Sequence, residues 1–415
     1  MNRIKRFIAV ISLTLTVALM AAGCGSTGET TTETTTVKET TAETTQIETT
    51  EAETAEADSS AEKDKTDDSD DADEEENEGP FSDRDMEQEV DLADAETITL
   101  SDGQDVEITS EGVYVITGDA ENVTIKVDAA DEKVQIVLDG VNITNSDSPA
   151  IYVAAAKKVW VTTTEDSENS LSVTGTFQAD GETNLDGVIF AKDDLVLNGL
   201  GTLNIDSTDN GIVAKDDLKV TGGTYNVTAA DDGFEVQDEI LICDGTFTVD
   251  AGKDGFHAED DDDDTKGPIT ISGGTFVINA AKQGLQATTV LTIDGGTFNI
   301  TATEGMEATY IQINGGDIYI SASDDGLNAS ANSTAYDVII EFNGGTTTIV
   351  MGAGDTDGVD ANGSIIVNGG TIDVTGNSTF DWDVSGTLNG GTVIVNGQQV
   401  TELPQSQMGG RGGRK

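Results

Sequence analysis

Two stretches decide the fold of this chain: residues 211–227, GIVAKDDLKVTGGTYNV, and residues 284–300, GLQATTVLTIDGGTFNI. Each contains three short runs in which apolar and polar residues alternate, and turns rich in Gly, Asp or Thr join the runs. A period of two is typical of β-strands, whereas an amphipathic helix repeats every 3.6 residues. The two stretches therefore predict strands, and their likeness predicts a repeated unit.

The repeat is marked by a glycine at the start of each unit. Successive glycines lie 24, 22, 22, 29, 21, 21 and 32 residues apart, so the unit has 21–22 residues and longer intervals hold insertions. Three short strands per unit predict an all-β fold, a parallel β-helix whose rungs pair at about 4.8 Å. The marker glycines are Gly187, Gly211, Gly233, Gly255, Gly284, Gly305, Gly326 and Gly358.

Within each run, alternate side chains are predicted to face the interior of the coil. In the first unit these are Ile212 and Ala214, then Leu218 and Val220. Equivalent residues of successive rungs then stack, and this predicts an aromatic column whose role is packing. The column comprises Tyr225, Phe247, Phe276 and Phe298.

The chain begins with a pattern typical of a secretion signal. Three basic residues precede an apolar run over 7–20, which is too short to span a bilayer comfortably, and small residues follow up to Cys24. This order resembles the lipobox of bacterial lipoproteins, and the alternative is an ordinary signal peptide with an incidental cysteine. We therefore expect residues 1–24 to be a lipoprotein signal, with Cys24 lipidated at the extracellular face of the bacterial cell membrane.

Composition divides the rest of the chain into three parts. Residues 25–80 are rich in Thr, Glu and Asp, with 20 acidic residues and 3 lysines, and cannot bury enough apolar surface to fold. They predict a disordered linker that holds a domain away from the membrane. Residues 81–403 carry the β-helix, and residues 404–415 predict a disordered Gly/Arg tail.

The net charge of −59 limits the partners of the chain. Nucleic acids and anionic membrane surfaces require clustered cations, which this sequence lacks, so we expect no nucleic-acid partner and membrane contact through the lipid only. The coil is itself acidic, because residues 81–415 hold 59 acidic and 14 basic residues. Residues 283–410 contain 15 Asp or Glu and no Lys or Arg, so this charge needs a partner from outside the chain.

The acidic residues recur at one place in the rung, in a turn and on the strand that follows it. That strand is predicted to present a column of outward residues: Val213, Glu235, His257, Gln286, Glu307, Asn328 and Asp360. Stacked carboxylates repel unless a cation lies between them, and Ca²⁺ prefers oxygen ligands in irregular geometry. The alternative is that each Asp caps its turn by accepting from backbone N–H groups. The candidate calcium ligands are Asp209, Asp231, Asp232, Glu235, Asp254, Glu304, Asp324, Asp325, Asp355, Asp357 and Asp360.

A family resemblance appears in the run over 134–145, VQIVLDGVNITN, and in the following PAIYV over 149–153. With the repeated Asp-Asp-Gly and Gly-Gly-Thr units, these resemble a family of secreted bacterial carbohydrate-binding domains over roughly residues 95–400. The resemblance implies a right-handed parallel β-helix similar in fold to pectate lyases, bound calcium, and binding of cellulose or polygalacturonate. Family members commonly carry Asp-Gly-Ile-His, whereas this chain keeps the histidine only at His257.

The leading hypothesis is a cell-surface lipoprotein whose calcium-loaded β-helix binds polysaccharide without cleaving it. No nucleophile elbow, Cys/His pair or zinc spacing is present in the sequence. An alternative is a calcium-dependent pectate-type lyase, and another is a structural or adhesive spacer. The candidate sugar-contacting residues are His257, Tyr319 and Trp382, and the candidate bases of a lyase are Lys192, Lys215, Lys253 and Lys282.

Overall fold

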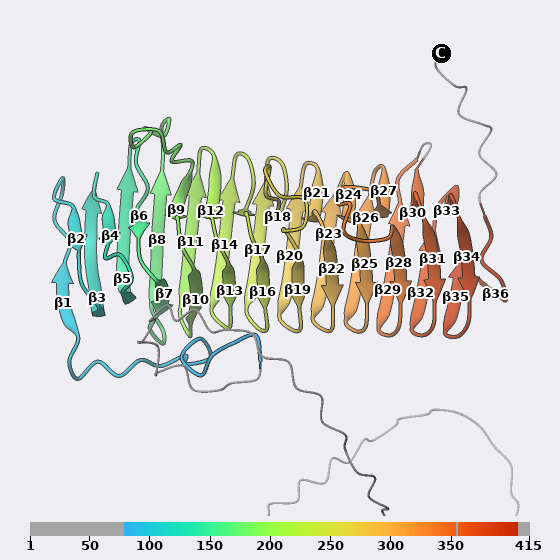
Figure 1. Cartoon of the computed structure of the whole chain (residues 1–415), viewed down its shortest axis with the longest axis horizontal. Helices are drawn as coiled ribbons and strands as arrows, with labels where there is room; N and C mark the ends of the chain where they lie inside the picture. The colour runs from blue at the N-terminus through green and yellow to red at the C-terminus, as the bar shows by residue number, and fades with distance from the viewer. Residues whose placement is uncertain (1–78, 354–355, 406–415) are drawn as a thin grey trace, which may run out of the picture. The chain divides into compact units, whose positions relative to one another are not determined.

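The structure, a computed structural model, describes residues 79–353 and 356–405. The described chain contains strands and turns without an α-helix, and no helix in it could span a membrane. The predicted signal, Cys24, most of the linker, Asp355 and most of the tail lie outside the described residues. Figure 1 shows the strands stacked side by side in one long coil.

Two sheets make up the coil, and successive rungs pair in parallel. The 12-stranded sheet comprises β2 (Val106–Ile108), β4 (Ile125–Asp128), β6 (Ile151–Ala155), β9 (Gly187–Ala191), β12 (Asn210–Ala214), β15 (Phe234–Val236), β18 (Phe256–Ala258), β21 (Gln283–Ala287), β24 (Glu304–Ala308), β27 (Asp325–Ala329), β30 (Asp357–Ala361) and β33 (Ser378–Trp382).

The 24-stranded sheet contains the other two columns of strands, which join where long β5 pairs with both β7 and β8. One column, with the N-terminal strands, comprises β1 (Glu96–Thr99), β3 (Gly112–Glu121), β5 (Lys133–Asn145), β7 (Lys158–Thr163), β10 (Leu195–Gly199), β13 (Leu218–Val220), β16 (Ile240–Ile242), β19 (Ile269–Ile271), β22 (Val290–Ile293), β25 (Tyr310–Ile313), β28 (Ile339–Phe342), β31 (Ser364–Val367) and β34 (Ser385–Leu388). The other comprises β8 (Glu168–Val173), β11 (Thr202–Ser207), β14 (Thr224–Ala229), β17 (Thr246–Ala251), β20 (Thr275–Ala280), β23 (Thr297–Ala302), β26 (Asp317–Ala322), β29 (Thr346–Met351), β32 (Thr371–Thr375), β35 (Thr392–Val395) and antiparallel β36 (Gln398–Val400).

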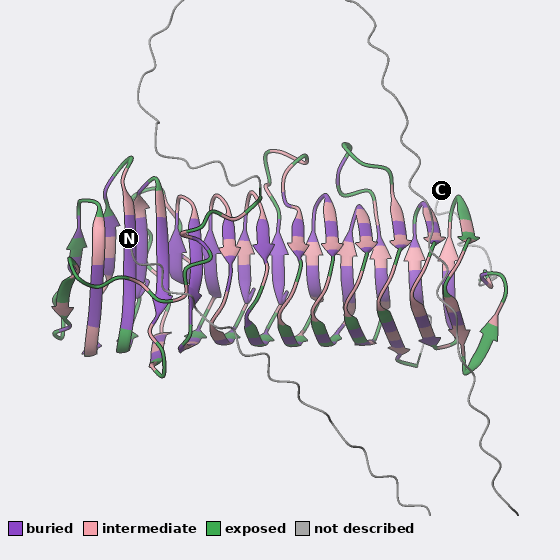
Figure 2. Ribbon diagram, turned by 90° about the horizontal axis from the view of Figure 1, so that it is seen from below, coloured by how far each residue is buried: buried purple, intermediate pink, exposed green. Residues whose placement is uncertain are grey.

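The core runs through the whole coil as columns of stacked side chains, which confirms the predicted parallel β-helix. Ile212, Ala214, Leu218 and Val220 are all fully buried, as predicted. Figure 2 shows buried positions alternating with intermediate or exposed ones along many of the strands. Each rung therefore seals its interior with residues from all three strands.

The predicted aromatic column is present in the interior. The rings of Phe247 and Phe276 are stacked with centroids 4.7 Å apart, and Phe276 and Phe298 are 4.5 Å apart. Tyr225 continues the column, 5.3 Å from Phe247. Gly274 precedes this position with a φ of +102°, a left-handed conformation that glycine adopts at little cost. The column is a packing feature because all four rings are buried.

One predicted exposure is wrong. Val213 pairs with Glu235 on the outer side of the 12-stranded sheet, as expected, but it is fully buried. It packs with Tyr152, Leu185 and Phe190 in a second apolar cluster outside the coil. Leu185 comes from the connection between β8 and β9, which covers this part of the outer surface. The alternation of apolar and polar residues within one strand could not predict that a segment from elsewhere in the chain covers Val213.

The repeat alignment is also off by one residue at its first unit. Gly187 lies opposite Asn210, so Val188 and not Gly187 occupies the marker position of Gly211. The register elsewhere follows the predicted marker glycines, because Ile212, Phe234 and Phe256 occupy equivalent positions in successive rungs.

A segment ahead of the coil, residues 80–89, lies against its outer side, and we call it the strap (Figure 1). Asp85 of the strap is fully buried and accepts a hydrogen bond of 2.9 Å from the indole N–H of Trp160. The guanidinium of Arg84 lies 4.0 Å from the centre of the Trp160 ring, a cation–π contact. The strap therefore covers an aromatic residue that would otherwise face solvent.

Further bonds fasten the strap to several rungs. The side-chain oxygen of Gln88 accepts from the backbone N–H of Gly199 at 2.9 Å. The free thiol of Cys243 lies in a turn, half-buried, 3.7 Å from the sulfur of Met86. The strap thus contacts the rungs of β5, β7, β10, β13 and β16.

Substituting Phe276→Ala tests the aromatic column. Removing a ring that stacks on both sides leaves a cavity, so we expect the free energy of unfolding to fall by about 3–5 kcal/mol. Denaturant unfolding measures the loss. The neighbouring Val277→Ala is the control, because Val277 faces outward and should change stability by less than about 0.5 kcal/mol. Equal effects of the two substitutions would contradict the column.

Substituting Asp85→Ala tests the strap. It removes a buried acceptor and leaves the indole N–H of Trp160 unpaired, so docking of the strap should weaken by about 1–3 kcal/mol. Trp160 then becomes hydrated, and its fluorescence emission should shift to the red. Glu89→Ala, at an exposed strap position, should leave the emission unchanged. An unshifted spectrum for Asp85→Ala would show that the strap does not depend on this contact.

Candidate functional site

The outer side of the 12-stranded sheet presents one residue per rung in strict register. The predicted column from Val213 to Asp360 is confirmed, and the pairing extends it at both ends. The column comprises Glu107, Lys126, Tyr152, Phe190, Val213, Glu235, His257, Gln286, Glu307, Asn328, Asp360 and Asp381. Polar and acidic groups therefore occupy it from Glu235 onward, on a rigid scaffold.

A second column, which we call the turn column, lies in the turn before each of these strands or at its first residue, and its side chains bond the backbone of the next rung. The side-chain oxygen of Asn210 accepts from the N–H of Asp232 at 2.9 Å, Asp232 accepts from the N–H of Asp254 at 2.8 Å, and Asp254 accepts from the N–H of Gln283 at 2.8 Å. One oxygen of each aspartate is thus used to hold successive turns together. Turn capping, which is the alternative to metal binding, therefore occupies one of the two carboxylate oxygens of Asp232 and of Asp254.

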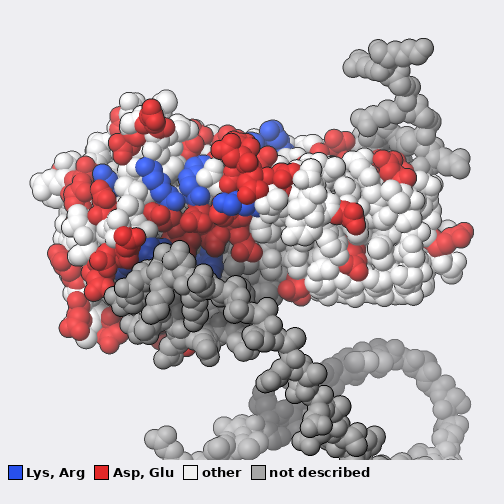
Figure 3. Space-filling view, viewed as in Figure 1, with Lys and Arg blue, Asp and Glu red and all other residues white. Residues whose placement is uncertain are grey.

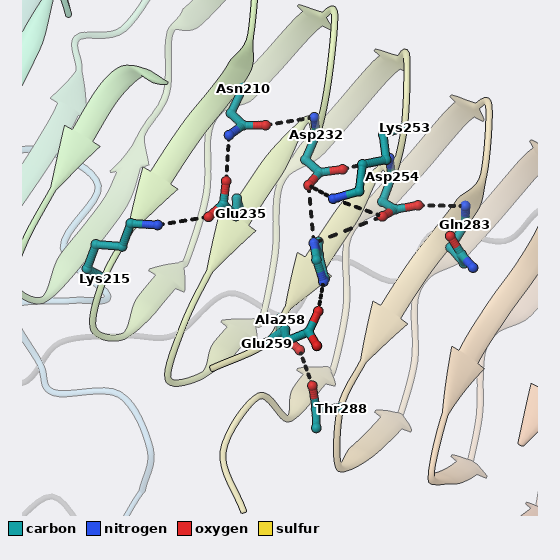
Figure 4. A network of polar contacts seen from close by, with 11 residues as sticks. Asn210, Lys215, Asp232, Glu235, Lys253, Asp254, Ala258, Glu259, Gln283 and Thr288 are labelled. Carbon is teal, nitrogen blue, oxygen red and sulfur yellow. Dashed lines mark hydrogen bonds and ion pairs between the residues drawn. The ribbon is translucent and has the colours of Figure 1, made fainter. Parts of the chain in front are cut away.

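The remaining oxygens of these aspartates face cations supplied by the chain (Figure 4). The second oxygen of Asp232 accepts from the Lys253 ammonium at 2.7 Å and lies 3.1 Å from Nδ1 of His257. The second oxygen of Asp254 is buried without a hydrogen bond, 3.7 Å from the Lys253 ammonium and 4.0 Å from His257 Nδ1. Lys253 and His257 therefore offset the two buried charges.

The environment of His257 favours its charged form. Its Nε2 lies 2.9 Å from a carboxylate oxygen of Glu259, so both ring nitrogens face carboxylates. Burial lowers the pKa of His257, but the hydrogen bond and charge of Asp232 outweigh burial and raise it above 6.5. The same competition raises the pKa of Lys253. His257 is only 9% exposed, which leaves little of its ring available to a sugar.

The neighbouring rung repeats this pairing of opposite charges. Lys215 lies 2.8 Å from a carboxylate oxygen of Glu235, and the amide of Asn210 donates to the other oxygen. Asp209 and Asp231, at half-buried turn positions, stack on one another through a backbone hydrogen bond of 3.2 Å. In this part of the coil, several of the predicted metal ligands are engaged with lysine, histidine or amide groups.

The column changes character from β24 onward. Oxygen atoms of Glu304, Asp324 and Asp325 lie within 4.8 Å of one another, and residues 283–353 and 356–405 contain no Lys or Arg to pair with them. The amide nitrogen of Asn328 donates to Glu304 at 3.1 Å, while its carbonyl oxygen is buried without a hydrogen-bond partner. This group therefore offers several oxygen atoms that no described cation satisfies.

Mutual repulsion and burial alter the ionisation of these acids. Burial is the largest cause that raises the pKa of Asp325 to about 7, and the charges of Asp360 and Asp324 add to it. Burial likewise raises the pKa of Asp360 to about 6, with contributions from Asp357 and Asp381. Holding these carboxylates ionised is costly unless a cation joins them.

The remaining predicted site residues are not all brought together. Asp357 belongs to the turn column and accepts from the hydroxyl of Ser378 in the next rung. Tyr319 lies on β26 in the 24-stranded sheet, 42% exposed. Trp382 is half-buried in the last rung, where it packs against the core. Tyr319 and Trp382 therefore lie in different sheets.

The structure also reveals an acidic cluster that was not predicted. Oxygen atoms of Asp216, Asp217 and Asp238 lie within 4.8 Å of one another, and Lys266 reaches Asp238 at 2.6 Å. Burial, with neighbouring carboxylates, raises the pKa of Asp216 and of Asp217 to about 6. Acidic doublets recur in successive rungs at Asp193 and Asp216, and that repetition is the signal that could have identified the cluster.

Comparison with known proteins identifies a family. A family model described as "Carbohydrate-binding domain-containing protein" matches residues 102–378. A relative with the same description, from Acetivibrio thermocellus, is 34% identical over 124 residues, which are 29% of this chain and 43% of the relative. The matched region thus spans less than half of that relative.

A solved structure, the gadolinium derivative of a polysaccharide lyase-like protein from C. thermocellum, aligns over 73% of this chain and 94% of its own. The identity is 21% and the TM-score is 0.32, and so loose an alignment supports no conclusion about this chain. The family match, in contrast, covers well over half of the residues, from β2 to the start of β33. This chain therefore belongs to the family of carbohydrate-binding domain-containing proteins.

Proposed function

We propose that this protein is a cell-surface lipoprotein that binds acidic polysaccharide through Ca²⁺ held on β24, β27 and β30, and does not cleave it. The observation that carries the proposal is the buried carbonyl oxygen of Asn328, which has no hydrogen-bond partner among the described residues and lies beside carboxylates that no described lysine or arginine neutralises. Family membership supports the polysaccharide, and the donor atoms support the ion. Lipidation of Cys24 and the extracellular location stay predictions from the sequence.

The donor set fits calcium better than a transition metal. It consists of carboxylate and amide oxygens on the outer side of the sheet and in the adjoining turns, and Ca²⁺ prefers six to eight such hard ligands in irregular geometry. Bound Ca²⁺ would neutralise the column and leave positions for the carboxylates and hydroxyls of a uronate chain. The residues that would hold it are Glu304, Asp324, Asp325, Asn328, Asp357 and Asp360.

The proposal narrows the calcium ligands predicted from the sequence. Asp232, Asp254 and Glu235 already lie against Lys253, His257 or Lys215, so a divalent ion there would have to displace a cation of the chain. Such an exchange gains less than binding to Glu304, Asp324 and Asp325, for which the described residues show no ion pair with lysine or arginine. We therefore place the ion in the C-terminal half of the column.

Cleavage by a lyase would require an uncharged lysine beside the ion to remove a proton from the sugar. Lys215 and Lys253 each donate to a carboxylate at 2.7–2.8 Å, and for Lys253 the hydrogen bond and charge of Asp232 outweigh burial and raise its pKa, which favours the ammonium form. Lys192 lies 5.7 Å from the ring centre of Tyr152, several rungs before β24. These contacts argue against Lys192, Lys215 and Lys253 as the base. Lys282 is exposed, and its backbone carbonyl accepts from the N–H of Glu304 at 2.9 Å, so it is the candidate base that the absorbance assay below tests.

Calcium titration of chelator-treated protein tests the ion. Asp325→Asn should weaken binding roughly tenfold or more, because affinity follows the number of charged ligands. Binding should also weaken from pH 8 to pH 5.5, since a carboxyl with a pKa of about 7 is then mostly protonated and must lose its proton. Asp250→Asn, on an exposed position of β17, is the control and should bind like the wild type. Equal affinities in all three proteins would contradict the site.

Retention on immobilised polygalacturonate tests the function. The wild type should be retained in calcium and released by chelator, and the double variant D325N/D360N should be retained far less at the same calcium concentration. Release of unsaturated uronate, followed by ultraviolet absorbance, would instead establish a lyase. A protein that is retained on no glycan but adheres to cells would favour the spacer alternative.

A further inference from the structure

One side of the 24-stranded sheet carries a regular array of hydroxyl groups. The outward residues at the start of β17, β20, β23, β26 and β29 pair directly with one another in successive rungs. All of them are exposed, and four of the five are threonine. They are Thr246, Thr275, Thr297, Asp317 and Thr346.

A second column runs beside the first and holds the largest exposed apolar side chains of this surface. Tyr319 is 42% exposed and Val277 is 38% exposed, and both lie between threonine or asparagine residues. None of the side chains of the two columns forms a hydrogen bond with another described group, so their hydroxyl and amide groups are available to a ligand. The second column comprises Thr248, Val277, Asn299, Tyr319 and Thr348.

The third column completes what we call the threonine face, the outward residues of β17, β20, β23, β26 and β29. Asp250 and Asp317 are its only ionisable acids, and it holds no lysine or arginine, although the coil as a whole is strongly acidic. Figure 3 shows a similar change along the coil, since charged side chains gather over the N-terminal half and the C-terminal half of the visible side is largely uncharged. The third column comprises Asp250, Asn279, Thr301, Ser321 and Val350.

Two other parts of the outer surface are unlike this one. The outer side of the 12-stranded sheet is acidic or covered by Leu185 and its neighbours. The strap covers the outward side chains of β7 and β10, where Trp160 is buried. Among the described residues, the threonine face therefore combines exposure, an almost complete lack of charge and an exposed aromatic ring.

We propose that the threonine face is a second binding surface, independent of calcium, for an uncharged polysaccharide chain in an extended conformation. Rungs repeat at about 4.8 Å, close to the advance per sugar of an extended β-1,4-linked chain lying along the coil. Hydroxyls of successive rungs can then bond successive sugars, while the ring of Tyr319 stacks on a sugar face. An acidic chain is disfavoured there, because Asp250 and Asp317 repel it. This second surface rests on the proposed function, because both assume that the ligand of this protein is a polysaccharide.

The experiment measures depletion of the full chain by microcrystalline cellulose in the presence of chelator, beside retention on polygalacturonate in calcium. Tyr319→Ala should weaken binding to cellulose roughly threefold to tenfold and leave retention on polygalacturonate unchanged. Tyr336→Ala is the matched control, because Tyr336 is an equally exposed tyrosine (45%) outside the face. Thr297→Glu, which adds a charge at an exposed position, should also weaken binding to cellulose.

The outcomes separate the two proposals. Cellulose binding that chelator abolishes, or that Tyr319→Ala and Tyr336→Ala reduce equally, would overturn the threonine face as a calcium-independent surface. Retention on polygalacturonate in calcium without any binding to cellulose would overturn the threonine face and leave the proposed function standing. The converse, cellulose binding in chelator without calcium-dependent retention on polygalacturonate, would support the threonine face and overturn the proposed function.

Discussion

Parallel hydrogen bonding between the backbones of successive rungs is the interaction on which the rest of this structure depends. It fixes equivalent residues directly above one another, so any residue type repeated in the sequence becomes a column in space. Phenylalanine repeated inside gives the stack through Phe276, and Asp or Asn repeated in the turn gives the chain of bonds from Asn210 to Gln283. Within each column the same kind of interaction therefore recurs at every rung, ring stacking in the aromatic column and hydrogen bonding to the backbone in the turn column.

The acidic column shows how one geometry supports different chemistry along its length. Near Asp232 and Asp254 the chain supplies Lys253 and His257, and the excess charge is offset internally. From Glu304 onward the same positions lack cations, and burial raises the pKa of Asp325 to about 7. The parallel pairing of successive rungs is the same in both regions. What differs is whether the neutralising charge comes from the chain or from solution.

Most of the fold could be predicted from the sequence, because a period-two pattern and a 21–22-residue repeat are local signals. The outward column from Glu235 to Asp360 followed from alternation alone. The burial of Val213 and the strap could not be predicted, since each depends on a segment that lies distant in sequence and carries no repeat. For the same reason the sequence suggested Asp232 as a ligand but not its pairing with Lys253, which depends on where a flexible side chain finds a partner.

The strap has a consequence for the order in which the chain folds. Asp85 meets Thr221 across 136 residues, and Trp160 across 75, so docking closes very long loops. Closing a loop of that length is entropically costly until the intervening rungs are in place. The strap should therefore be the last part of that half to order, although it precedes all of these rungs in the sequence. Its arrival marks completion of the rungs from β1 to β13, and a rung that failed to form would leave Trp160 open to solvent.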